Sequence, residues 1–207
     1  MKVLLINGSP NEHGSTMRAL LECKQTLEEL EAETKIYNVG KNPRRACITC
    51  GNCKTTKKCV FDDLDELCKD LTISDAVIIG TPTHYASIPG NLLSILERIL
   101  YSSKHTVENK PIAVIGTGRR GCISEAIRDV KKFFEFASCP IISGSYPAIL
   151  YSTGFDNAEK DKEGLKNMRS ISKNLFYIAN CIQIAKEKGI YPPKEEIGEK
   201  TDISSII

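Results

Sequence analysis

The sequence lacks a strong excess of either charge, a basic stripe with interleaved aromatic residues and any long apolar run. Its 207 residues carry a formal net charge of +2, so no strongly charged partner and no nucleic acid are expected. The longest apolar runs, such as residues 76–80, are far too short to cross a bilayer. No signal peptide is recognisable, and we expect a cytoplasmic protein without a membrane partner.

The hydrophobic pattern predicts the fold. Hydrophobic residues make up 41% of the chain, which suits a globular domain with one core. Short β-branched runs alternate with longer amphipathic segments, as in parallel strands joined by crossover helices. Strands are expected at 3–6, 34–37, 76–79, 112–115 and 141–144, and helices at 15–31, from Asp62 or Asp63 to about 71, at 88–100, 124–136 and 162–188. This order predicts an α/β, flavodoxin-like, doubly wound five-stranded parallel sheet of order 2-1-3-4-5, in a domain at 1–190 followed by a tail at 191–207.

The most informative feature is a compact cysteine run. Four cysteines lie within thirteen residues in the spacing C-x2-C-x2-C-x5-C: Cys47, Cys50, Cys53 and Cys59. This spacing puts four thiolates within reach of one metal centre, and a ferredoxin-type run opens in the same way. Cationic neighbours lower thiol pKa values and offset the charge of a thiolate-ligated cluster. Five surround the run: Arg44, Arg45, Lys54, Lys57 and Lys58. An iron–sulfur cluster is therefore favoured in the loop at 47–59.

Two alternatives for this run stay open. Zinc also takes four cysteines, usually as two separated CxxC pairs, and in the other alternative the thiols hold no metal. Disulfides between adjacent CxxC pairs are strained and belong to oxidising compartments. The remaining five cysteines lie in or beside predicted buried segments, where a thiol behaves as a small hydrophobe. We assign them to packing, with Cys122 the weakest case because it follows a glycine loop: Cys23, Cys68, Cys122, Cys139 and Cys181.

Three loops follow the first, third and fourth predicted strands, where ligands bind in open α/β sheets. The first, at 8–16, combines glycines and hydroxyls with a helix N-terminus, which favours a phosphate. It is not a Walker A loop, because one residue too many separates its glycines and no lysine follows. A monophosphate is the better fit, and an ordinary serine N-cap is the alternative.

The other two loops complete the predicted pocket. In the loop at 80–87, a proline and an aromatic ring can frame a flat heterocycle, and His84 is a candidate proton donor. The loop at 116–121 matches G-x-G-x-x-G, but it follows the fourth strand, and Glu135 lies within a predicted helix where it cannot hold a ribose. We interpret it as a wall of the same pocket. Arg119 and Arg120 there can stabilise negative charge or dock a phosphorylated donor.

Four segments together resemble a known family: KVLLINGSPNEHGST, ACITCGNCKTTKKC followed by VFDD, AVIIGTPTHYASIPGNL and GTGRRG. They are similar to the iron–sulfur flavoproteins, within the flavodoxin-like group of NADPH-dependent FMN reductases. The resemblance implies noncovalent FMN, a 4Fe-4S cluster on the four cysteines of the run, and homodimers or homotetramers that bring clusters near flavins of neighbouring subunits. Carried over by position, it implies a flavin site of Ser9, Asn11, Ser15, Thr16, Pro82, Thr83, His84, Tyr85, Ala86, Ser87, Thr117, Gly118 and Gly121.

The predicted function is electron transfer between a 4Fe-4S cluster and FMN, an oxidoreductase role in which the protein positions the two groups and tunes their potentials. The expected redox partner is a ferredoxin or NAD(P)H. A cluster-free NAD(P)H-dependent FMN or quinone reductase is one alternative. A zinc-stabilised interaction module is another, from a different class.

Overall fold

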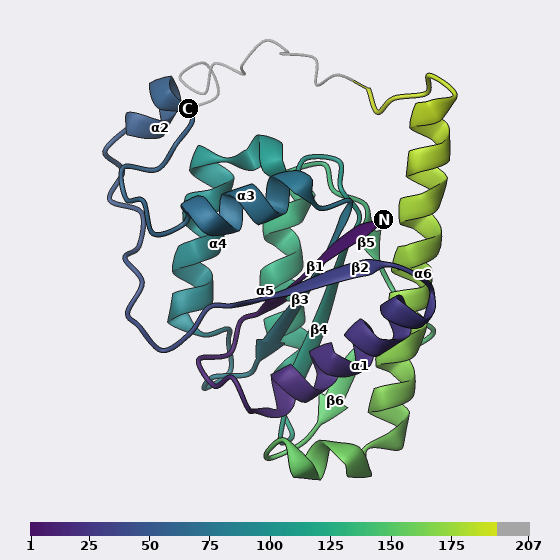
Figure 1. The fold of residues 1–207 in the computed structure, drawn as a ribbon. Coiled ribbons are helices and arrows are strands. Elements are labelled where there is room, and N and C mark those ends of the chain that lie inside the picture. The colour runs from purple at the N-terminus through teal and green to yellow at the C-terminus, as the bar shows by residue number, and fades with distance from the viewer. Residues whose placement is uncertain (194–207) are drawn as a thin grey trace, which may run out of the picture.

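The computed structural model of the protein describes residues 1–193, and within them the strands form one parallel sheet (Figure 1). The strands are β1 (Lys2–Asn7), β2 (Glu33–Asn38), β3 (Ala76–Pro82), β4 (Ile112–Gly118), β5 (Ile141–Ile142) and β6 (Ile149–Tyr151). Their order is β2-β1-β3-β4-β5, with β6 also beside β4, and every pair is parallel. The flavodoxin-like order predicted from the hydrophobic pattern is therefore confirmed.

Two short strands share one edge of β4. β5 pairs with Ile112 and Ala113, and β6 pairs farther along β4 with Gly116, Thr117 and Gly118. The strand predicted at 141–144 thus ends at residue 142, and the chain leaves the sheet before β6 returns to it. The sequence pattern did not predict β6, nor the short 3₁₀ helix η2 (Asp156–Lys160) that follows it.

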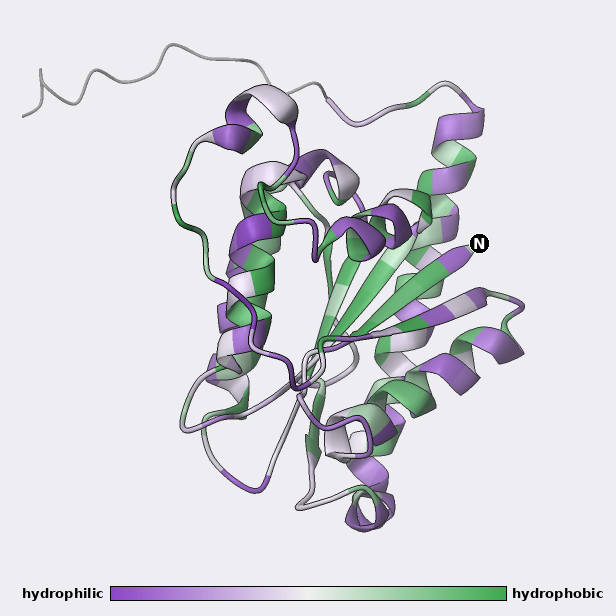
Figure 2. Cartoon of the chain, turned by 60° about the vertical axis from the view of Figure 1, so that its left-hand side comes forward, coloured by the Kyte–Doolittle hydropathy of each residue, from purple (hydrophilic) through white to green (hydrophobic). Residues whose placement is uncertain are grey.

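Helices cover both faces of the sheet (Figure 1). α1 (Ser15–Glu29) and α6 (Lys162–Glu187) pack on one face, and α3 (Asp65–Ile73), α4 (Gly90–Ser102) and α5 (Ile123–Glu135) pack on the other. Because both faces are covered, the inner strands β1, β3 and β4 are apolar on both sides, whereas the edge strand β2 is only partly buried. Figure 2 shows the inner strands mostly in green, between helices that alternate hydrophobic and hydrophilic segments. Consecutive residues of β1 such as Leu4 and Leu5 are accordingly both buried, one toward each layer.

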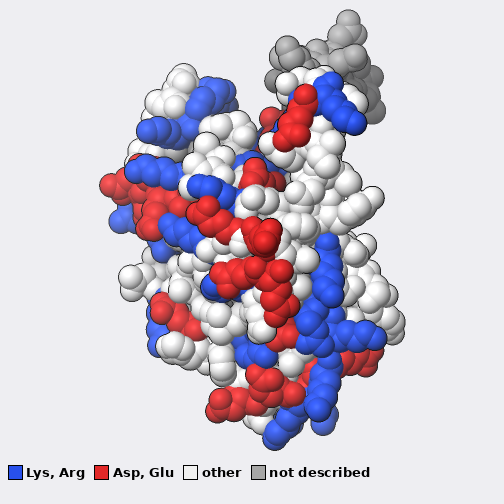
Figure 3. All heavy atoms as spheres, turned by 45° about the vertical axis from the view of Figure 1, so that its right-hand side comes forward, with Lys and Arg blue, Asp and Glu red and all other residues white. Residues whose placement is uncertain are grey.

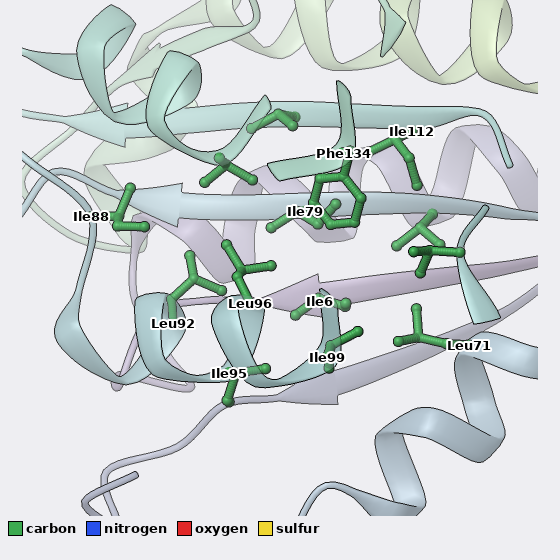
Figure 4. Close-up of a cluster of buried hydrophobic side chains, with 14 of the residues drawn as sticks. Ile6, Leu71, Ile79, Ile88, Leu92, Ile95, Leu96, Ile99, Ile112 and Phe134 are labelled. Carbon is green, nitrogen blue, oxygen red and sulfur yellow. The ribbon is translucent and has the colours of Figure 1, made fainter. Parts of the chain in front are cut away.

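The position of α4 is fixed by its apolar side. Leu92, Ile95, Leu96 and Ile99 recur at helical spacing and are all buried against the sheet, where Ile79 of β3 lies in the same cluster (Figure 4). Burial of such side chains contributes roughly 1.5–3 kcal/mol each. α4 is therefore a rigid connection between the loop that precedes it and the residues at its C-terminal end.

The aspartate cap predicted for the second helix, at Asp62 or Asp63, is wrong. α3 begins at Asp65 after Leu64, and no side chain caps it. The carboxylate of Asp63 accepts hydrogen bonds from Arg44 and Arg98 instead, so it is not available to the helix. The other predicted helices are present, with ends shifted by one or two residues. The short helix α2 (Asn52–Thr56) inside the cysteine loop was not predicted.

Charges of both signs are mixed on the surface. Figure 3 shows basic side chains beside acidic ones over the face that it displays. The carboxylate of Glu22 on α1 pairs with Arg18 on the same helix and with Arg169 on α6, which ties the two helices together. Within residues 1–193, no helix is long and apolar enough to span a membrane. Most of the tail predicted at 191–207 lies outside the described residues, which end at 193.

Candidate functional site

The three loops predicted to form one pocket lie together at the carboxyl ends of β1, β3 and β4. The backbone N–H of Gly8 donates to the carbonyl of Gly80 at 2.8 Å, which joins the first loop to the second. The N–H of Thr83 donates to the carbonyl of Thr117 at 2.9 Å, which joins the second loop to the third. The sheet order explains this arrangement, because β3 lies between β1 and β4.

A buried asparagine organises the first loop. Asn7 is the last residue of β1, and its side chain is fully buried. Its Oδ1 accepts from the N–H of Ser9 at 3.2 Å, and its Nδ2 donates to the carbonyl of Asn11 at 3.4 Å and to Oδ1 of Asn38 at 3.0 Å. Asn7 was not among the predicted site residues. The feature that could have identified it is a polar residue at the end of an apolar run.

The first turn of α1 faces this loop without a side-chain cap. The N-cap is Gly14 rather than a serine, and no side chain accepts a hydrogen bond there. Ser15 is the first helical residue, and the hydroxyl of Thr16 lies 2.8 Å from that of Thr117. The serine-cap alternative is therefore wrong. Uncapped N–H groups at a helix N-terminus favour an anion.

The second loop contains a buried hydroxyl without a protein partner. Oγ1 of Thr83 is buried and makes no hydrogen bond. Beyond it the chain turns tightly, because the N–H of His84 donates to the carbonyl of Ser87 at 2.8 Å and the reverse bond is 3.1 Å. Tyr85 and Ala86, inside this turn, take positive φ angles of 46° and 78°. An unpaired buried hydroxyl costs free energy unless something else satisfies it, so Thr83 is suited to meet a polar ligand atom.

Two glycines of the third loop are required by close packing. A Cβ on Gly116 would lie 2.6 Å from Ile123, and one on Gly118 would lie 3.0 Å from the same side chain, whereas Gly121 has open space around it. Arg119 and Arg120 are exposed. The glycines therefore allow α5 to lie close to β4.

The four cysteines of the compact run line a cavity away from the three loops. The loop between β2 and α3 contains α2, with left-handed residues at Thr49, Gly51 and Lys57. A cavity of about 300 Å³ is lined by Cys47, Cys50, Cys53 and Cys59, and also by Phe61, Arg98, Tyr101 and Ser102. The sequence analysis expected one loop around one centre, and the structure places all four sulfur-bearing residues on one cavity.

The geometry of this cavity bears on what it can hold. Among the described residues, no group of three or more His, Cys, Asp or Glu side chains converges on a single ion position. A lone zinc ion requires such convergence, because Zn–S distances are about 2.3 Å. A 4Fe-4S cluster instead takes one thiolate at each of its irons, so its ligands stand around the group. Four cysteines around one cavity fit a cluster in this respect.

A buried arginine closes the cysteine loop onto α4. The side chain of Arg98 is 1% exposed. It forms an ion pair with Asp63, donates to the carbonyl of Arg45 at 3.3 Å, and donates from Nε to Sγ of Cys59 at 3.3 Å. Hydrogen bonding from Arg98, assisted by Arg44, holds the pKa of the Asp63 carboxyl below its usual value. Arg98 lies about forty residues beyond the run and was not among the predicted site residues.

The basic residues predicted around the run take different places. Lys54 lines the cysteine cavity. Lys57 and Lys58 line a neighbouring cavity, which they share with Cys59. Arg44 is held by Asp63 at 3.2 Å, and the guanidinium of Arg45 lies over the ring of Phe61 at 5.0 Å. Of the five predicted basic residues, Lys54 is therefore the one that borders the cavity.

The two candidate sites lie at opposite ends of α4. The helix begins at Gly90, just after the second loop, and its last residues Tyr101 and Ser102 line the cysteine cavity. Thirteen residues of helix rising 1.5 Å each span on the order of 20 Å. Figure 1 shows α2 at the end of the sheet away from the carboxyl ends of the strands. Within one chain, the three loops and the cysteine cavity are therefore separated by the length of α4.

The other five cysteines divide into two classes. Cys23 and Cys139 are buried, and burial raises their pKa values to about 12 and about 11. Cys68 is half-buried, and burial raises its pKa as well. Cys122 and Cys181 are exposed. The assignment to packing is therefore wrong for these two, because Cys122 lies in a left-handed turn before α5 and Cys181 lies on the outward side of α6.

Comparison with known proteins identifies the family. Residues 1–153 match the family described as NADPH-dependent FMN reductase. An iron–sulfur flavoprotein from Methanocaldococcus jannaschii is 31% identical over 202 residues, covering 91% of this chain and 98% of that protein. A second from the same organism is 26% identical over 88% of this chain and 100% of its own length. A flavodoxin from the domain Archaea superposes with a TM-score of 0.59 at 12% identity, over 87% of this chain and 99% of that one. The chain therefore belongs to the NADPH-dependent FMN reductase family and, within it, to the iron–sulfur flavoproteins.

Proposed function

We propose that this protein is an electron-transfer flavoprotein, in which FMN binds at the three loops and a 4Fe-4S cluster binds at Cys47, Cys50, Cys53 and Cys59. The observation that carries the proposal is the cavity that all four cysteines line. Its relatives named iron–sulfur flavoproteins support the same assignment. When bound, the cluster supplies one-electron chemistry and the flavin exchanges one or two electrons.

The three loops hold the flavin through groups already in place. The uncapped first turn of α1, which includes the backbone N–H of Thr16, and the hydroxyls of Ser9 and Ser15 receive the phosphate. The residues of the second loop, Pro82 to Ser87, lie along the ring, and the unpartnered hydroxyl of Thr83 is available to its polar edge. Thr117, Gly118 and Gly121 form the third wall. A basic residue near Pro10, frequent in the family, is replaced here by Asn11 and Glu12, so backbone and hydroxyl donors carry the phosphate contact.

A second copy of the chain completes the electron path. Within one chain the two sites are separated by the length of α4, on the order of 20 Å. A homodimer or homotetramer that sets the cysteine loop of one subunit beside the flavin loops of another removes this separation. The electrons come from a reduced ferredoxin or from NAD(P)H and pass to a quinone, an oxygen species or another small acceptor. The cytoplasmic location stays a prediction.

A cluster-free NAD(P)H-dependent reductase is the second candidate function. The family description and the exposed Arg119 and Arg120 next to the flavin loops favour it, because arginines bind the phosphates of a nicotinamide nucleotide. Anaerobic titration with dithionite separates the two functions. The electron-transfer flavoprotein takes up one electron more per chain than its FMN accounts for, and an electron paramagnetic resonance signal of a reduced cluster appears. Uptake limited to the two electrons of FMN would contradict the electron-transfer function and support the cluster-free reductase.

A further inference from the structure

The strongest unassigned feature of the cysteine cavity is the contact between Arg98 and Cys59. Nε of Arg98 donates to Sγ of Cys59 at 3.3 Å, from a side chain that is 1% exposed. Arginines are rarely buried unless their charge is paired. Here one carboxylate, that of Asp63, forms an ion pair with the guanidinium, and Asp63 is itself 34% exposed. The sulfur of Cys59 is then a further acceptor, in a bond that the charge of the guanidinium strengthens.

The remaining contacts of Arg98 come from both ends of the cysteine loop. The guanidinium donates to the carbonyl of Arg45, just before the first cysteine, at 3.3 Å. It also donates to the carbonyl of Phe61, just after the last cysteine, at 3.4 Å, and its charged carbon lies 5.1 Å from the centre of the Phe61 ring. A single side chain on a helix fixed by core packing thus holds both ends of the loop and one of the four sulfurs.

We propose that Arg98 is a positioning residue that sets the reduction potential of the cluster through its bond to Cys59. This inference rests on the proposed function. A hydrogen bond to a ligating sulfur, and a positive charge beside it, stabilise the reduced cluster because reduction adds negative charge. Burial strengthens the effect, since water screens the guanidinium little. Arg98 therefore raises the potential of the centre, and it does so from α4, outside the cysteine run.

Arg44 provides a matched control. It also binds Asp63, at 3.2 Å, and it donates to the carbonyl of Val39 at 3.2 Å, but the structure gives it no bond to a cysteine. Arg98→Gln and Arg44→Gln each remove one positive charge and one partner of Asp63. Only Arg98→Gln also removes the donor to Cys59. A difference between the two variants therefore reports on the contacts that Arg98 makes and Arg44 does not, namely those to Sγ of Cys59 and to the carbonyls of Arg45 and Phe61.

The experiment measures the iron, sulfide and FMN content and then the midpoint potential of the cluster in wild type, Arg98→Gln and Arg44→Gln, all purified without oxygen. We expect the potential of Arg98→Gln to be clearly more negative than that of Arg44→Gln. Loss of the cluster in Arg98→Gln alone, with FMN retained, also supports a direct role. Equal shifts in both variants, or loss of the cluster from both, would show that Arg98 acts only through Asp63. A wild type with FMN but no iron would instead refute the proposed function itself.

A measurement on the wild-type protein covers the case in which Arg98→Gln does not fold. Protein grown with ¹⁵N-arginine is reduced, and pulsed electron–nuclear resonance is recorded on the cluster signal. We expect a ¹⁵N coupling that Arg44→Gln retains. A cluster signal without any arginine coupling would contradict the contact between Arg98 and Cys59.

Discussion

The hydroxyls of Thr16 and Thr117 lie 2.8 Å apart and hydrogen-bond to each other, although 101 residues separate them in the chain. Thr16 is in the first turn of α1, and Thr117 is near the end of β4. Both side chains are at most 1% exposed. This bond ties the first loop to the third and so sets the width of the predicted flavin site.

Replacing Thr117 with Val should destabilise the flavin-free protein. The variant leaves the buried hydroxyl of Thr16 without its partner, which costs about 1–3 kcal/mol. Urea unfolding followed by circular dichroism measures the change. Thr55→Val, at an exposed position in α2, is the control and should alter stability by less than about 0.5 kcal/mol. Equal stability of Thr117→Val and wild type would mean that the hydrogen bond between the two hydroxyls does not stabilise the folded protein.

Thr83→Val should behave in the opposite way. Because Oγ1 of Thr83 has no partner in the protein, its removal should leave the flavin-free protein as stable as wild type or slightly more stable. FMN binding should weaken by roughly 5–10-fold, the value of one hydrogen bond of about 1 kcal/mol. Quenching of flavin fluorescence gives the dissociation constant. Unchanged FMN affinity would remove Thr83 from the flavin site.

The glycines of the third loop should differ in their tolerance of alanine. A Cβ at Gly116 would lie 2.6 Å from Ile123 and 2.7 Å from Ile127, both of α5, so Gly116→Ala should cost about 1–3 kcal/mol through overpacking. Gly121→Ala has open space and should be near neutral. Thermal unfolding of the two variants compares them directly. A similar loss of stability in Gly116→Ala and Gly121→Ala would contradict the packing explanation.

The sheet order and the meeting of the three loops were predictable from sequence because they depend on patterns within short segments. β-branched runs marked the long strands, and glycines with hydroxyls marked the loops after them. β6 was not predicted, since three residues are too few for a periodic signal. Arg98 was not predicted either, because a charged residue in an amphipathic helix normally faces water. Its burial depends on the cysteine loop folding over it, which is a tertiary effect.

The exposed and buried cysteines should separate by reactivity. The thiolate is the nucleophile, and burial holds the pKa values of Cys23 and Cys139 near 12 and 11. Iodoacetamide at pH 8 should therefore label Cys122 and Cys181 and leave the two buried thiols unlabelled, and peptide mass spectrometry measures the labelling of each cysteine. Rapid labelling of Cys23 in folded protein would contradict its burial.

The pKa values of the two buried thiols also predict a pH dependence of stability, because they lie above the ordinary thiol value of 9.0. The free energy of unfolding should fall as the pH rises above 9, where the thiols of the unfolded chain ionise and the buried ones do not.

The most direct test is chemical analysis of iron and acid-labile sulfide in protein purified without oxygen, for wild type, Cys50→Ser and Cys181→Ser. Cys50 lines the cavity and Cys181 is exposed on α6, so the two variants make the same chemical change at a proposed ligand and at a remote thiol. We predict about four irons and four sulfides per chain in wild type and Cys181→Ser, and a large loss of both in Cys50→Ser with FMN retained. Wild-type protein that contains FMN but neither iron nor sulfide would contradict the account.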